Sequence, residues 1–152
     1  MIRQINAAGL EIIESSEQLR LAGYLPTLND KPTAGWGHTG PDVRVGETYP
    51  MSQCLAWLHQ DLGWAENVVS LHAKGPLNDN QFSALVSLCF NIGSGNFDSS
   101  TLLKDLNAAD LDDAANQFLV WDKQRGKGLP GLDIRRARER ALFLTPVDNT
   151  GA

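Results

Sequence analysis

The chain has 152 residues, of which 42% are hydrophobic and 20% are charged, and its formal net charge is −5. These values are typical of one folded globular domain and exclude an intrinsically disordered chain. No apolar run of about 18 residues occurs, so we expect neither a membrane-spanning helix nor stable membrane association. The net negative charge argues against nucleic acid as a general partner.

The first helix is predicted over residues 5–14, where apolar residues recur at spacings near three and four. Prolines and glycines then interrupt residues 21–45 at a density that excludes a long helix. Such a segment is typical of a small twisted β-hairpin with turns. Elsewhere in the sequence, no stretch of similar length has so high a density of prolines and glycines.

Helical patterns return after Pro50, and an apolar stripe over residues 55–69 predicts a core-facing helix. Asn78, followed three residues later by Gln81, resembles a capping box at the start of the next helix. Gly93 is a suitable residue to end that helix. Most of the chain beyond the hairpin is therefore expected to be helical.

A further helix is expected to be capped by Ser99 or Ser100, and two more are predicted over residues 111–121 and 134–144. Together these elements predict a mainly α fold of the α+β class.

The fold is expected to have two lobes. A small β-rich lobe spans about residues 15–48, and a larger helical lobe takes in residues 1–14 and 49–145. A cleft between the two lobes is the expected place for a ligand.

The two cysteines, Cys54 and Cys89, are too few and too far apart for a disulfide framework or a metal cluster. Both lie in apolar, helix-like runs, so we expect buried free thiols. Ligand-type residues nowhere else show the spacing of a metal site. The sequence therefore predicts neither a metal ion nor an organic cofactor.

Three residues around the hairpin could carry chemistry. Glu17 follows the first predicted helix, and the hairpin carries a second carboxylate, Asp30, and a hydroxyl, Thr33. Cleavage of a glycosidic bond needs one carboxylic acid that protonates the leaving oxygen and a second, ionised group on the opposite face of the sugar. Acidic residues near turns are more often ordinary surface residues, so the residues alone leave both interpretations open.

The same segment resembles the signature of phage-type lysozymes, glycoside hydrolase family 24. The matching residues around the hairpin are Glu17, Leu19, Arg20, Leu21, Tyr24, Thr33, Gly35, Trp36, Gly37, His38 and Thr39. Further matching blocks lie at residues 40–43, 80–85, 90–93, 99–103, 129–132, 135–136 and 139–143. The resemblance covers about residues 5–144 in the family's order. It implies a lysozyme-like fold and a single catalytic domain over residues 1–152.

The resemblance implies a peptidoglycan-degrading muramidase, an endolysin that hydrolyses the β-1,4 bond between N-acetylmuramic acid and N-acetylglucosamine. Glu17 would be the general acid, and Thr33 would help to hold the attacking water. The substrate-binding residues would be Asn91, Ser99, Ser100 and Arg135. Of these, the arginine would also lie close to the acid and steady its geometry.

The sequence departs from the family pattern at the second carboxylate. The family's aspartate normally lies nine residues after the acid, where this chain has Pro26. We assign the role to Asp30, the nearest carboxylate; the alternative is a turn residue whose side chain bonds nearby backbone. In that case Glu17 works alone or with Thr33. Glu14 competes for the acid role on the same helical face, and the pattern favours Glu17.

Two further expectations concern residues outside the catalytic set. His38 and Asp61 match a pair that the family uses as a structural ion pair near the hairpin. Trp57 and Trp64 lie at helical spacing, where packing in the core is the commoner role of a tryptophan.

The expected partner is bacterial peptidoglycan, and the protein is expected to be a monomer. Residues 1–6 are too polar for a secretory signal, so we expect it in the host cytoplasm, with a holin needed for release to the periplasm and cell wall at lysis. One alternative function is a lytic transglycosylase, which cuts the same bond with a single carboxylate. A catalytically inactive cell-wall-binding module is the alternative from another class.

Overall fold

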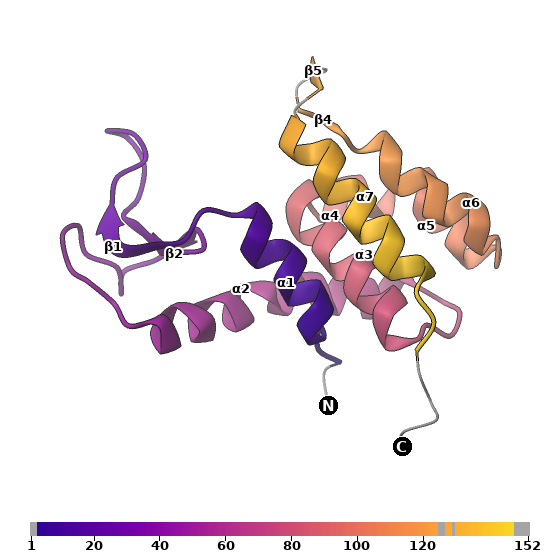
Figure 1. Cartoon of the computed structure of the whole chain (residues 1–152), viewed down its shortest axis with the longest axis horizontal. Helices are drawn as coiled ribbons and strands as arrows, with labels where there is room; N and C mark the ends of the chain where they lie inside the picture. Colours follow the sequence, from indigo (N-terminus) through magenta and orange to yellow (C-terminus); the bar gives the residue numbers. More distant parts are fainter. Residues whose placement is uncertain (1–2, 125–126, 129, 148–152) are drawn as a thin grey trace. The chain divides into compact units, whose positions relative to one another are not determined.

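The computed structural model describes residues 3–124, 127–128 and 130–147, and it confirms the mainly helical α+β class (Figure 1). In chain order the elements are α1 Ala7–Ser16, β1 Arg20–Tyr24, β2 Thr33–Gly35, β3 His38–Thr39, α2 Met51–His72, α3 Asp79–Ile92, α4 Ser94–Asp98, α5 Thr101–Asn107, α6 Leu111–Gln117, the 3-10 helix η1 Phe118–Val120, β4 Lys123–Gln124, β5 Lys127–Gly128 and α7 Pro130–Leu144. None of the helices among the described residues combines the length and apolar character needed to cross a membrane.

The chain divides into two compact units. The hairpin unit is Glu14–Gly63, and the helical unit consists of Met1–Ile13 with Trp64–Ala152. The hairpin unit extends beyond the β-rich lobe that the sequence placed at residues 15–48, because the first turns of α2 supply its core. Cys54 on α2 is buried against the sheet. A Cβ atom added at Gly35 would lie 3.4 Å from the Cβ of Cys54.

The hairpin unit contains a three-stranded antiparallel sheet in the order β1-β2-β3. Thr33 pairs with Thr39 and Ala34 pairs with His38 across the β2–β3 turn. Gly35 has a φ of 65°, a conformation that side chains with a Cβ rarely adopt, and this permits the tight turn. The predicted hairpin is therefore confirmed, with one strand more than a simple hairpin has.

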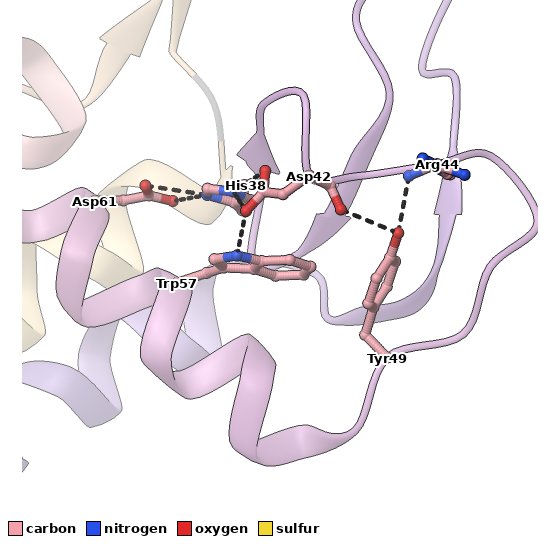
Figure 2. A network of polar contacts seen from close by, with 6 residues as sticks. All are labelled: His38, Asp42, Arg44, Tyr49, Trp57 and Asp61. Atoms are coloured by element: carbon pink, nitrogen blue, oxygen red, sulfur yellow. Dashed lines mark hydrogen bonds and ion pairs between the residues drawn. The ribbon is translucent and has the colours of Figure 1, made fainter.

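A network of polar contacts joins the sheet to α2 (Figure 2). His38 Nδ1 lies 2.8 Å from Asp61 Oδ2 on α2, which confirms the predicted ion pair. Its Nε2 lies 3.1 Å from Asp42 Oδ1, and its ring stacks on Trp57 with 4.5 Å between centroids. The Trp57 indole N–H donates to Asp42 Oδ2 at 2.7 Å. His38 is 6% exposed and Trp57 is 4% exposed, whereas the Asp42 side chain is 50% exposed, so the stacked rings lie inside the unit and the Asp42 carboxylate lies at its surface.

The helical unit is built on the packing of α3 against α7. Eight consecutive residues of α3, from Phe82 to Cys89, are buried. The predicted capping box is present, because the Asn78 side chain accepts from Gln81 N–H while the Gln81 side chain accepts from Asn78 N–H. Gly93 ends α3 with a φ of 92°, as predicted.

Element boundaries differ from the prediction where local hydrogen bonds decide them. Helix α1 begins at Ala7 because Asn6 Oδ1 accepts from Gly9 N–H and so caps the helix, and it continues to Ser16. The last turn of the helix predicted over 111–121 is the tighter η1. The short β4–β5 pair had no counterpart in the prediction.

Both cysteines are buried free thiols, as predicted. Burial is the main reason that the pKa of the Cys89 thiol rises to about 12, and burial also raises the pKa of the Cys54 thiol. Neither thiol is therefore ionised in neutral solution, and both pack as small apolar groups.

Replacing Asp42 by asparagine is expected to lower the free energy of unfolding in neutral solution. The free energy of unfolding of the variant should also decrease less in acid than that of the wild type. The hydrogen bond from His38 holds the pKa of the Asp42 carboxyl below its ordinary value of 3.8. The ionised carboxylate therefore stabilises the fold above that value, and its contribution is lost as the pH falls through the lower folded pKa. Urea unfolding between about pH 7 and pH 2 should show the difference between the two proteins narrowing in acid. A difference that does not change with pH would contradict this.

Candidate active site

Two of the predicted catalytic residues line one surface pocket of the hairpin unit. The pocket has a volume of about 380 Å³. Its lining residues are Pro26, Asn29, Asp30, Lys31, Thr33 and Thr39. Asp30, to which we assigned the second carboxylate, thus lines the same pocket as Thr33, the predicted water-holding residue. The proline that occupies the family's aspartate position lines the same pocket.

Thr33 begins β2 and is 5% exposed. Its hydroxyl donates to the Lys31 carbonyl oxygen at 3.0 Å. A hydroxyl has one hydrogen and two lone pairs, so Thr33 Oγ1 is left as an acceptor for a molecule in the pocket. Local backbone geometry therefore sets how this side chain can serve a ligand.

Asp30 is exposed and lies in the loop between β1 and β2. Its backbone N–H donates to the Thr27 carbonyl oxygen at 3.1 Å, and the Thr27 hydroxyl donates to Asp30 Oδ2 at 2.9 Å. These bonds are those of a turn residue, yet they hold the carboxylate at the pocket rather than remove it. Among the described residues, Asp30 Oδ1 makes no hydrogen bond and remains an acceptor.

Glu17 is half-buried and follows α1 directly, before β1 begins at Arg20. It belongs to the same compact unit as Asp30 and Thr33. Glu14, the competing candidate, lies within the last turn of α1 and is also half-buried. The two carboxyl groups are thus similar in burial and lie three residues apart in the sequence.

The predicted substrate-binding residues Asn91, Ser99 and Ser100 belong to the helical unit. Asn91 is exposed in the last turn of α3, and the exposed Ser99 hydroxyl donates to the Gly95 carbonyl at 2.9 Å. Ser100 is buried and caps α5: its Oγ accepts from Leu103 N–H and donates to the Phe97 carbonyl. This cap uses the hydrogen of the Ser100 hydroxyl, and contact of these residues with substrate stays a prediction.

Arg135 is part of a buried ionic cluster between α7 and α3. Its Nε donates to Glu139 Oε2 at 3.2 Å, and its Nη2 donates to the Ser87 carbonyl at 3.1 Å. Burial raises the pKa of the Glu139 carboxyl, while Arg136 and Arg135 oppose that shift. The predicted role of Arg135 in steadying Glu17 and binding substrate stays a prediction.

Sequence reasoning missed that Arg136 holds Asn91. The wholly buried Arg136 donates through Nη2 to Asn91 Oδ1 and forms an ion pair with Glu139 at 3.1 Å. The Asn91 amide therefore turns its oxygen toward Arg136. The two residues are 45 positions apart, and no local pattern in the sequence connects them.

The expectation of core packing holds for one tryptophan and is wrong for the other. Trp57 is 4% exposed and stacks on His38, whereas Trp64 is 42% exposed. Trp64 is two positions from the buried Leu62, so it lies on another face of α2 than the buried stripe. Its ring packs at a tilt against Phe90, with centroids 6.1 Å apart.

Over residues 3–124, 127–128 and 130–147, no three His, Cys, Asp or Glu side chains are grouped so that they could hold a metal ion. His38 is engaged by two carboxylates from the network of Figure 2, where it has a structural role.

Comparison with known proteins identifies the family. A family model described as phage lysozyme matches residues 14–139. The endolysin of Salmonella phage P22 is 41% identical over 146 residues, which cover 93% of this chain and 99% of that protein. A P22 lysozyme mutant superposes with a TM-score of 0.86 at 41% identity, covering 94% of this chain and 99% of that one. The muramidase domain of SpmX from Asticaccaulis excentricus superposes with a TM-score of 0.84 at 36% identity, covering 95% and 99%. The chain therefore belongs to the phage lysozyme family and is a lysozyme-type glycosidase.

Proposed function

We propose that the chain hydrolyses the β-1,4 bond between N-acetylmuramic acid and N-acetylglucosamine in bacterial peptidoglycan, with Glu17 as the general acid and Asp30 as the general base. The observation that supports the proposal most is the pocket of the hairpin unit, which both Asp30 and Thr33 line. Such a pair can hold a water molecule for attack on a sugar. Glu17 in the same unit supplies the second carboxyl group.

In the proposed reaction, the protonated Glu17 carboxyl gives its proton to the glycosidic oxygen as the bond from that oxygen to C1 breaks. The electron pair of the broken bond stays on the leaving oxygen. A water molecule in the pocket attacks C1 from the opposite face, and its proton passes to the Asp30 carboxylate. Thr33 Oγ1 accepts the water's second hydrogen, which its own bond to the Lys31 carbonyl leaves it able to do.

The names of the relatives support a cellular role for this chain. The P22 relative is named an endolysin, and we place the action of this chain likewise at the bacterial cell wall during host lysis. A monomeric state, origin in the host cytoplasm and release by a holin belong to this proposal. Binding of the glycan by Asn91, Ser99, Ser100 and Arg135 belongs to it as well.

Glu17→Gln is expected to lower the rate of peptidoglycan lysis by about 10²–10⁴-fold, because glutamine cannot protonate the leaving oxygen. The measurement is the loss of turbidity of a purified peptidoglycan suspension. Glu14→Gln is the matched control, since it removes a similarly half-buried carboxyl three residues away. Normal lysis by Glu17→Gln would remove it from the acid role, and loss in Glu14→Gln alone would transfer the role there. If the chain is an inactive wall-binding module, the wild type, Glu17→Gln and Glu14→Gln will all fail to lyse peptidoglycan.

Asp30→Asn is expected to reduce lysis by about 10²-fold or more, since the amide cannot accept the proton of the attacking water. Thr27→Val is the control, because it removes the hydroxyl that bonds Asp30 but keeps the carboxylate. We expect the control to lose far less activity than Asp30→Asn. If Asp30→Asn lyses peptidoglycan at the normal rate, Asp30 is a turn residue only, and the family assignment is unaffected.

A further inference from the structure

The pocket contains a second hydroxyl that the proposed reaction does not use. Thr39 on β3 is the cross-strand partner of Thr33 on β2, and both line the pocket with Asp30. Directly paired residues project from the same face of a sheet, with Cβ atoms about 4.5–5.5 Å apart. The two threonine side chains therefore approach one small volume from adjacent strands.

The two hydroxyls differ in what they can offer a ligand. Thr33 is buried, and its hydrogen is used on the Lys31 carbonyl. Thr39 is exposed, and its hydroxyl makes no hydrogen bond to any residue that the structure describes. Thr39 is thus able to donate into the pocket, where Thr33 and Asp30 can only accept.

The position of Thr39 is well defined although its side chain is exposed. Alternation along β3 directs the preceding residue, His38, to the opposite face. There His38 is held by Asp61 at 2.8 Å and by Asp42 at 3.1 Å. A residue next to such an anchored side chain has little freedom of backbone movement, so Thr39 remains one of the residues that line the pocket.

We propose that Thr39 orients the attacking water by donating a hydrogen bond to its oxygen. This inference rests on the proposed function, in which Asp30 takes the water's proton. One water hydrogen then points to Asp30, the other to Thr33 Oγ1, and one lone pair accepts from Thr39 Oγ1. The remaining lone pair forms the bond to C1. Thr39 transfers no proton and serves as a positioning residue.

The test compares Thr39→Val, which keeps size and β-branching but removes the hydroxyl, with Thr39→Ser, which keeps the hydroxyl. Rates are measured on soluble, uncrosslinked peptidoglycan strands, so that kcat and KM can be separated. We expect valine to lower kcat about tenfold or more with little change in KM, because water without its donor is misplaced for attack. Serine is expected to restore kcat to within about threefold.

Three outcomes would overturn the inference. Normal kinetics of Thr39→Val would show that the hydroxyl does nothing, and a raised KM at normal kcat would assign it to sugar binding. Failure of serine to restore kcat would show that a hydroxyl at this position is not what supports kcat. Thermal unfolding of both variants checks the fold, and we expect unchanged midpoints because the side chain is exposed.

Glu17→Gln and Asp30→Asn are assayed beside these variants on the same strands. If both remain active, the proposed function itself has failed. If both lose activity while Thr39→Val does not, only the role of Thr39 is wrong. The two failures are therefore distinguishable.

Discussion

The hairpin unit depends on the contacts of one imidazole. Strands of two or three residues do not form a stable sheet by themselves, and they need a helix to pack against. His38 provides that connection, because both ring nitrogens face carboxylates and its ring stacks on Trp57 of α2 (Figure 2). An imidazole held at both nitrogens cannot turn, so β3 is fixed on α2. Thr33 and Thr39 line the pocket on the other face of β2 and β3, so their backbone positions are fixed by the same contacts.

A buried ionic cluster has a similar place in the helical unit. Glu139 has no exposed surface and is surrounded by Arg135, Arg136 and Ser87. Burial of charge is costly, and the cluster is maintained only because each charged group has a close partner of opposite sign or a hydrogen bond. Arg136, a member of this cluster, donates a hydrogen bond to the amide oxygen of Asn91, which is exposed at the surface. In each unit, then, a buried polar group holds an element that carries a proposed functional side chain.

Local signals predicted much of this structure. The capping box at Asn78, the glycine that ends α3 and the hairpin all follow from side chains near in sequence, and all three are present. The ion pair of His38 with Asp61 came from the family resemblance and is also present.

What could not be predicted depends on register and on distant contacts. Thr39 joins Thr33 only once the strand pairing is known, since a shift of one residue would send it to the other face. The contact of Arg136 with Asn91 joins α7 to α3 across 45 residues. Trp64 has the spacing of a helical residue, but the exposed or buried side of α2 is decided by what packs against it.

In the proposed reaction, a water molecule held in the pocket of the hairpin unit attacks the sugar from the face opposite the leaving group. The most direct measurement follows the anomeric proton of the newly formed reducing end by NMR during the first turnovers on soluble peptidoglycan strands. Direct attack by water inverts a β-linkage, so we expect the α-anomer to form first and then to equilibrate with the β-anomer. Initial formation of the β-anomer, or an anhydro product that lacks a reducing end, would contradict it.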